Sequence, residues 1–188
     1  DSLPPTFHVA GTNGKGSTCA FLRAALEASG RTVHAFTSPH LVRFNGRIRI
    51  AGTLVQDEEL ADLLGEVLDA GDNLEASFFE VTTAVAFLAF ARTPADATIV
   101  EVGLGGRLDA TNVIDRPLVG GIAPLGIDHQ QFLGASLAEI AAEKAGIGKP
   151  GVPLVVLAQP AEAEDAIQRA AEERGAVVYL EGREWAVD

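Results

Sequence analysis

The chain alternates between short apolar runs and longer segments in which apolar residues recur every three or four positions. Runs rich in branched side chains predict strands, and they cover residues 7–10, 32–37, 98–102, 118–122, 153–157 and 177–179. Apolar positions at helical spacing predict helices, and they cover residues 17–29, 57 to about 71, 79–90, a segment beginning at 136, and 162–174. This alternation predicts an α/β fold, in which helices cover both faces of a mostly parallel sheet.

Three local patterns add detail to that outline. Residues 43–55 alternate in polarity and contain a Gly52-Thr53 turn, which predicts a small β-hairpin inserted into the fold. Asp57 is predicted to cap the helix that follows the hairpin. Ser136 and Glu139 have the spacing of a capping box, which predicts a helix beginning at that point.

Length and composition favour one globular domain, because the 188 residues are 47% apolar and 21% charged. The net charge of −12 argues against nucleic-acid and anionic-membrane partners, although an acidic protein can still bind a small anion locally. The apolar runs are too short to span a bilayer. A single cysteine, Cys19, excludes an internal disulfide framework and favours a reducing compartment such as the cytoplasm.

A glycine-rich segment lies where a phosphate-binding loop must lie, between the first strand and the first helix. Its members are Gly11, Thr12, Asn13, Gly14, Lys15, Gly16, Ser17 and Thr18. Glycines let successive N–H groups point at phosphate oxygens, and the helix N-terminus adds a partial positive charge. Lys15 would reach the β- and γ-phosphates of ATP, and Ser17 would supply a hydroxyl to Mg²⁺. The loop is shorter than the standard motif, and the less favoured alternative is a glycine-rich turn with a solvated lysine.

An acidic residue at the end of a buried strand is the candidate magnesium ligand. Glu101 ends the strand at 98–102, where an open α/β sheet places its ligand-contacting residues. The alternative is a carboxylate satisfied by backbone amides within residues 103–106. Glu80 competes for the metal role, although capping of the helix at 79–90 accounts for it equally well.

The later half of the chain adds weaker candidates. Asp128-His129 follows a strand, and its spacing leaves His129 as readily structural as a ligand. Lys144 lies near a helix C-terminus, where a solvated lysine is the default interpretation. Ser38 offers another hydroxyl near the same sheet edge, and His40 is as readily a turn-stabilising residue as a reactive one.

Five segments together carry a resemblance to a known family. Residues 11–17, 37–41, 101–112, 128–129 and 143–147 occur in the order found in folylpolyglutamate synthase/dihydrofolate synthase, of the Mur ligase superfamily. The resemblance covers nearly the whole chain, and the run EVGLGGRLDATN is highly specific. It implies that residues 1–188 form one ATP-binding domain with the P-loop NTPase-like fold of a Mur ligase central domain.

The resemblance also implies an activity and its cofactors. The family joins L-glutamate to dihydropteroate, to a reduced folate, or to both. Transfer of the ATP γ-phosphoryl group to a carboxylate gives an acyl phosphate, which the glutamate amine can attack. ATP and Mg²⁺ are the implied cofactors, and the whole protein is expected to be a cytoplasmic monomer acting on small molecules.

Site residues follow from the same resemblance. It assigns Ser17, Ser38, Glu101 and His129 to one or two magnesium ions. Lys144 resembles the lysine that reacts with CO₂ to form a carbamate, so Lys15, Lys144 and His129 are the expected catalytic residues. The segments expected to line the pterin site contain Ser77, Phe78, Phe79, Glu80, Leu108, Asp109 and Ala110. Phe78 or Phe79 would contact the planar ring, and Asp109 would accept hydrogen bonds from it.

The resemblance is incomplete in three respects. A helical segment before Asp1 and a C-terminal domain that completes the ATP and glutamate sites are expected outside this chain. Gly46 stands where the family usually has glutamate, in a hairpin region that tolerates glycine. The isolated 188 residues are therefore expected to have weak activity or none.

Two other functions remain open from the sequence. A small-molecule kinase would explain residues 11–17 and Glu101, but not Asp128-His129 together with Lys144. A non-catalytic nucleotide- or pterin-binding module would bind ATP and dihydropteroate without turnover. A requirement for glutamate, with release of ADP and phosphate, distinguishes a ligase from both.

Overall fold

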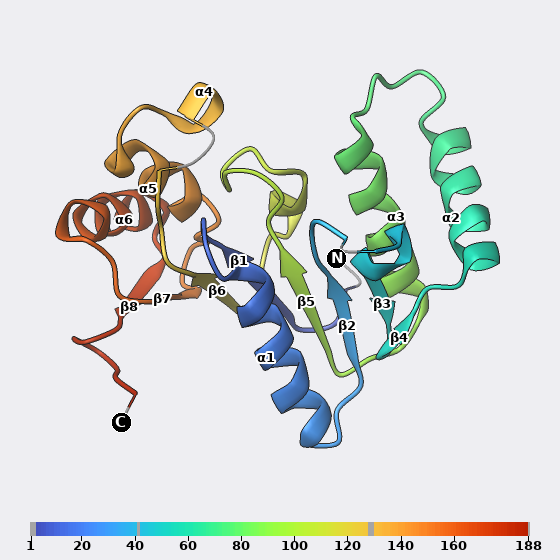
Figure 1. Ribbon diagram of the computed structural model, residues 1–188, viewed down its shortest axis with the longest axis horizontal. Helices are drawn as coiled ribbons and strands as arrows, with labels where there is room; N and C mark the ends of the chain where they lie inside the picture. The colour runs from blue at the N-terminus through green and yellow to red at the C-terminus, as the bar shows by residue number, and fades with distance from the viewer. Residues whose placement is uncertain (1–2, 41, 128–129, 188) are drawn as a thin grey trace.

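An eight-stranded sheet forms the centre of the molecule (Figure 1). The computed structural model describes residues 3–40, 42–127 and 130–187. The strand order is β4-β3-β2-β5-β1-β6-β7-β8, and all neighbours are parallel except β3 with β2 and β4. The predicted mostly parallel sheet with a hairpin insertion is therefore confirmed. The strands are β1 Thr6–Ala10, β2 Val33–Phe36, β3 Ile48–Ile50, β4 Thr53–Leu54, β5 Ala97–Glu101, β6 Val119–Ile122, β7 Pro153–Val156 and β8 Val177–Leu180.

The predicted helices are all present, with boundaries within a few residues of those expected. The structure adds two short 3₁₀ segments and the single-turn helix α4, which the apolar spacing does not reveal because each is about one turn long. The helical elements are α1 Lys15–Ala28, η1 Phe44–Arg47, α2 Asp57–Ala70, α3 Phe78–Arg92, η2 Ala110–Val113, α4 Gln130–Leu133, α5 Leu137–Ala145 and α6 Ala161–Arg174.

Helices cover both faces of the sheet around β5. Ile99 and Val100 are consecutive residues of β5, so their side chains point to opposite faces. Ile99 packs in a cluster with Cys19 of α1, whereas Val100 packs in a cluster with Phe90 of α3. A third cluster joins β6, β7 and β8 to α5 and α6, which lie side by side in Figure 1.

Two local predictions about the hairpin region need correction. Asp57 does not cap α2, because Gln56 holds the cap position and Asp57 is the first helical residue. Its carboxylate instead accepts hydrogen bonds from Arg43 and Asn45, 2.6 and 2.9 Å away. The hairpin turns one residue earlier than predicted, at Ala51-Gly52, where both residues have positive φ.

Within the described residues, two capping boxes stabilise helices that border the candidate site. Ser136 and Glu139 form the predicted box at the start of α5. Ser77 and Glu80 form a second box at the start of α3, so the capping account of Glu80 is confirmed. Each box satisfies orphan N–H groups at a helix N-terminus and determines where the loop before it enters the helix.

The parallel arrangement gathers the chemically distinctive loops at one edge of the sheet. Strands β1, β2, β5 and β6 are neighbours and run in the same direction, so their carboxyl ends lie together. The loops that begin at Gly11, Thr37, Val102 and Ala123 leave from that edge. Open α/β sheets bind ligands at this edge, so the fold brings the sequence motifs to the place where a site is expected.

His8 is a fully buried polar residue in the middle of β1. Its Nε2 lies 2.8 Å from Thr111 Oγ1, whereas its Nδ1 has no hydrogen-bond partner among the described residues. Burial, reinforced by the charge of Lys149, lowers the pKa of His8 from 6.5 to about 3. His8 is therefore neutral in the folded protein at physiological pH.

We expect His8 to make the protein less stable in acid. As the pH falls below 6.5, the unfolded chain binds a proton at this residue that the folded chain does not bind. The free energy of unfolding should therefore decrease by up to about 1.4 kcal/mol per pH unit from this residue between pH 6.5 and about 3. His8→Gln lacks this titration, so urea unfolding at a series of pH values should give a shallower dependence. An unchanged dependence in the variant would contradict the assignment.

Candidate phosphate and metal site

The loop between β1 and α1 has the form of a phosphate-binding loop, but not all of its amides are available. Gly14 occupies the N-cap position of α1 in the left-handed conformation, with φ of 77°, and no side chain caps the helix. The first N–H groups of the helix therefore have no acceptor within the helix or from a capping side chain. In contrast, the amides of Thr12 and Asn13 donate to the Pro124 carbonyl, at 3.2 and 3.0 Å. The amides of Thr12 and Asn13 are thus engaged within the protein, whereas those at the start of α1 have no capping side chain and could bind phosphate.

The Gly11 carbonyl connects this loop to α5 by accepting hydrogen bonds from two lysines. It accepts hydrogen bonds from Lys15 Nζ at 3.1 Å and from Lys144 Nζ at 2.9 Å. Gly11 has φ of 148°, and a Cβ on it would lie 2.7 Å from the Cβ of Ala123. A larger residue could not adopt this conformation without displacing the loop after β6.

Lys144 is a buried residue, so its interpretation as a solvated lysine is wrong. Only 4% of it is exposed, and its ammonium group lies beside the phosphate-loop backbone. A buried ammonium group is costly unless hydrogen bonds or charges compensate it. Gly146, two residues later, allows the close approach of Arg107, because a Cβ on Gly146 would lie 2.4 Å from the Arg107 Cβ.

Glu101 ends β5 with its carboxylate almost fully buried. Its Oε2 accepts a hydrogen bond from the Ser38 amide at 3.0 Å, not from the glycine amides of residues 103–106 that the alternative account names. Burial raises the pKa of Glu101, and the Ser38 amide and the charges of Lys15 and Arg47 partly offset the rise. A bound divalent cation would stabilise the ionised form that burial disfavours.

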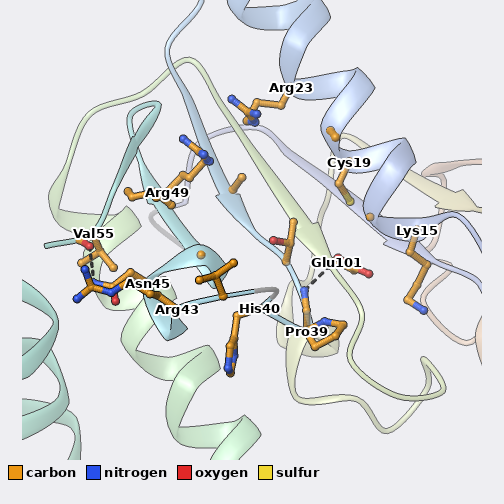
Figure 2. Close-up of a pocket in the computed structure, with 18 of the residues that line it drawn as sticks. Lys15, Cys19, Arg23, Pro39, His40, Arg43, Asn45, Arg49, Val55 and Glu101 are labelled. Atoms are coloured by element: carbon orange, nitrogen blue, oxygen red, sulfur yellow. Dashed lines mark hydrogen bonds between the residues drawn. The ribbon is translucent and has the colours of Figure 1, made fainter. Parts of the chain in front are cut away.

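An open cleft of about 1320 Å³ brings most of the predicted phosphate and metal residues together. It is lined by Lys15, Ser17, Ser38 and Glu101, together with Gly14 and Gly16 of the loop. Figure 2 shows Lys15 and Glu101 on its walls, with Arg23 from α1 and Arg49 from β3 farther along it. The carboxylate and hydroxyl oxygens here are hard ligands suited to Mg²⁺, which also takes oxygens from phosphate and water. Among the described residues, however, no three His, Cys, Asp or Glu side chains form a metal-binding group.

His129 lies outside the described residues, as does Asp128. His40 does lie within them and lines the cleft, where its Nδ1 accepts a hydrogen bond from Arg47 Nε at 3.0 Å. Its predicted structural role in this turn is consistent with that contact. Its ring also packs edge-on against Phe44 at 5.9 Å.

Arg47 is a candidate site residue, near Glu101, that the sequence did not indicate. Its guanidinium carbon lies 5.9 and 5.8 Å from the ring centroids of Phe44 and Phe78. Its positive charge is near enough to lower the pKa of Glu101. The residue precedes β3 and comes near Glu101 through sheet pairing, so no local motif could have identified it.

A second, smaller cavity of about 290 Å³ gathers the predicted pterin segments. Six of the seven predicted residues line it, and Leu104, Leu133 and Glu143 line it as well; the six are Ser77, Phe79, Glu80, Leu108, Asp109 and Ala110. Phe78 lies elsewhere, with its ring edge-on to Phe44 at 5.6 Å and 65% of the residue exposed. Of the two phenylalanines considered, the geometry therefore favours Phe79.

Phe79 reaches this position because Gly103 has no side chain. A Cβ on Gly103 would lie 2.4 to 2.8 Å from three atoms of the Phe79 ring. Both carboxylate oxygens of Asp109 accept protein hydrogen bonds, from Leu104 and from Thr111, and its predicted role as an acceptor for the pterin ring stays a prediction. Its first function in the structure is to hold the loop that lines the cavity.

Sequence comparisons point to one group of enzymes. The chain is 46% identical over 177 residues to the dihydrofolate synthase/folylpolyglutamate synthase of Bacillus subtilis. The alignment covers 90% of this chain and 41% of that relative. The chain is 39% identical over 182 residues to the Escherichia coli enzyme of the same name, covering 97% of this chain and 42% of the relative. No family model matches the chain.

Solved structures agree with the sequences. E. coli FolC in complex with ADP superposes with a TM-score of 0.93 at 38% identity, covering 99% of this chain and 44% of that one. A bifunctional folylpolyglutamate synthase/dihydrofolate synthase with Mn, AMPPNP and L-glutamate bound gives a TM-score of 0.91 at 38% identity, covering 99% and 45%. Over nearly all of its length, the chain is similar in sequence and in structure to folylpolyglutamate synthase/dihydrofolate synthase enzymes.

The chain spans less than half the length of these folylpolyglutamate synthase/dihydrofolate synthase relatives. None of its described helices is long and apolar enough to cross a membrane. The resemblance recognised in the sequence motifs is confirmed by both comparisons.

We expect Glu101→Gln to stabilise the ligand-free protein at neutral and alkaline pH. Burial raises the pKa of Glu101 in the folded protein above the value of 4.5 that it has in the unfolded chain. As the pH rises above 4.5, the unfolded chain therefore loses this proton more readily than the folded protein does, and the free energy of unfolding decreases. Urea unfolding should show a greater free energy of unfolding for the variant at pH 8 and a smaller difference at pH 4. Glu75→Gln, at an exposed site, should show neither change. A variant less stable than the unmodified chain at pH 8 would contradict this prediction.

Proposed function

We propose that this chain is the ATP-binding part of a ligase that joins L-glutamate to dihydropteroate, to a reduced folate, or to both. The observation that carries the proposal is the uncapped start of α1 beside the buried carboxylate of Glu101, in one cleft with Lys15. A relative of this fold has been solved with ADP, and another with Mn, AMPPNP and L-glutamate. The names of the sequence relatives support the same activity.

Activation of a carboxylate explains why such a site is needed. A carboxylate is a poor acyl donor because oxide is a poor leaving group. Transfer of the γ-phosphoryl group from ATP to the carboxylate gives an acyl phosphate, and the glutamate amine then displaces phosphate to form the amide. Phosphoryl transfer depends mainly on positioning and on neutralisation of charge. The amides of α1 and the ammonium of Lys15 would meet these demands, with Mg²⁺ neutralising phosphate charge when bound.

The proposed ligands of Mg²⁺ are Glu101 and the hydroxyls of Ser17 and Ser38, with His129 as a further candidate. Glu101, Ser17 and Ser38 line the same cleft, which supports this set. Lys15 donates to Gly11 in the described conformation, so it would exchange this bond for a phosphate oxygen. We assign the pterin to the second cavity, against Phe79, because the loop after β5 and the start of α3 enclose it there.

A carbamate on Lys144 is the proposed modification. The ammonium group would first lose a proton to solvent, and the neutral amine would then attack CO₂, form a nitrogen–carbon bond and lose a second proton, so that a cation becomes an anion overall. Burial of Lys144 beside the phosphate loop supports the proposal, because a change of charge there would act directly on the loop. The anion could then order a metal ion or its neighbours.

The remaining elements of the whole protein are proposed to lie outside these residues. We infer that residues 1–188 form one ATP-binding domain, and that a further domain completes the ATP and glutamate sites. The coverage of less than half of each relative supports this inference. The proposed partners are small molecules.

Lys15→Ala should abolish most ligation in the complete protein that contains this chain. Loss of one preorganised cation at the phosphate should reduce the rate by about a hundredfold or more. The assay is glutamate-dependent release of ADP and phosphate, with circular dichroism to check the fold. Arg169→Ala, which removes an exposed cation from α6, is the matched control and should retain activity. Ligation near the unmodified rate in Lys15→Ala would refute the phosphate-loop assignment, and ADP release without a glutamate requirement would favour a kinase.

Lys144→Ala should lose ligation and recover part of it when a small carboxylate is added, because the added anion can replace a carbamate. The measurement is ligation rate against concentration of formate or acetate, with Lys15→Ala as a control that should not respond. Complete loss without any recovery would argue against the carbamate and leave the ammonium as the functional group.

A further inference from the structure

A chain of buried hydrogen bonds runs from the middle of β1 to the loop that follows β5. His8 Nε2 lies 2.8 Å from Thr111 Oγ1, and both residues are fully buried. The hydroxyl of Thr111 and its amide both bond to Asp109 Oδ1. Asp109 Oδ2 then accepts the Leu104 amide at 2.8 Å. Four residues from two separate segments are thus connected in series.

The direction of each bond follows from the chemistry of the groups. An ionised carboxylate only accepts, so the single hydroxyl proton of Thr111 is donated to Asp109. Thr111 Oγ1 must therefore accept from His8, which places the imidazole proton on Nε2. The chain therefore requires a proton on Nε2, and because His8 is neutral its Nδ1 carries none.

These bonds hold one wall of the second cavity. Leu104, Leu108, Asp109 and Ala110 line that cavity, and they lie within the loop that Asp109 and Thr111 close. Asn112 anchors the end of the same loop, because its Nδ2 donates to the carbonyls of Arg107 and Gly146. The His8 bond is the connection from this loop to the central strand that leads into the phosphate loop.

We propose that His8 is a positioning residue for the acid substrate, acting through Thr111 and Asp109 to hold the wall formed by Leu104 to Ala110. The proposal rests on the proposed function, since it assigns the pterin-bearing acid to this cavity. His8 does not line the cavity itself, so it acts without touching the substrate. Within the described residues, His8 Nδ1 has no hydrogen-bond partner. An apolar residue at this position of β1 would fill the core without burying an unpaired nitrogen. Because burying the unpaired nitrogen costs free energy, we infer that histidine is useful at this position for the hydrogen bond made by its Nε2.

Four variants of the complete protein test the proposal. His8→Leu removes the donor at similar volume, and Thr111→Val removes the hydroxyl that connects it to Asp109. His8→Gln retains an N–H donor at a comparable reach. Thr98→Val is the matched control, because Thr98 is equally buried on the neighbouring strand and its hydroxyl has no partner among the described residues.

We expect His8→Leu and Thr111→Val each to raise the KM for dihydropteroate by about tenfold, because a wall that is no longer held in place must be ordered when the acid binds. The KM for ATP and kcat should stay within about twofold, because the lost interaction acts on binding of the acid alone. The double variant should be no worse than Thr111→Val, since both changes break one chain. His8→Gln should recover most of the loss, and Thr98→Val should not change either KM.

A second measurement reports on the stability of the cavity wall itself and does not depend on activity. Hydrogen exchange at the Leu104 amide should be faster in His8→Leu and Thr111→Val than in the unmodified protein, and unchanged in Thr98→Val. Equal rises in the KM values for ATP and acid, or an unchanged Leu104 exchange rate, would overturn the proposal. If the unmodified protein does not bind dihydropteroate, the proposed function fails, whereas the exchange rates still decide whether His8 positions the loop. If His8→Leu does not fold, Thr111→Val alone decides the outcome by the same two measurements.

Discussion

The burial of one carboxylate at the end of a central strand determines most of the candidate site. Glu101 is 2% exposed and raised in pKa, so the fold maintains an ionisable group where its charge is disfavoured. The Ser38 amide, Lys15 and Arg47 surround it and reduce that cost without removing it. A divalent cation would supply the missing positive charge. The site is thus less stable without ligand than an uncharged equivalent would be, which is a common property of binding sites.

The positive charges of the site are local, although the chain as a whole carries a net charge of −12. Lys15 and Lys144 share one acceptor, the Gly11 carbonyl, so both side chains reach the backbone of the phosphate loop. A polyphosphate at this loop would be attracted by positive charge close by. The proposed nucleotide fits that local charge.

Close backbone approach is the second structural requirement of the site. Gly103 accommodates the Phe79 ring, and Gly106 lies so near α5 that a Cβ there would be 2.8 Å from the Lys144 carbonyl. These contacts pack the loop after β5 against both α3 and α5, which brings the two cavities to the same edge of the sheet. The His8 chain adds a polar connection to β1, and the loop is therefore held from several directions. Rigid walls of this kind reduce the ordering cost of binding a substrate.

The sequence by itself determined the order and type of the main elements, because apolar periodicity and β-branched runs depend only on local spacing. It also indicated the phosphate loop and Glu101 as candidate site residues, since each belongs to a contiguous motif at a strand end, and the same motifs carry the family resemblance. The sequence could not determine that Lys144 is buried against Gly11, that the amides of Thr12 and Asn13 are used by Pro124, or that Asp109 is satisfied internally. It also missed the position of Arg47 near Glu101 and the hydrogen bond from His8 to Thr111. The predicted start of α2 and the predicted hairpin turn each differ by one residue from those in the structure. Most of these features join residues far apart in the chain, and a hydrogen bond between distant segments depends on how the strands are ordered and paired. Only the tertiary structure decides which donors and acceptors then meet.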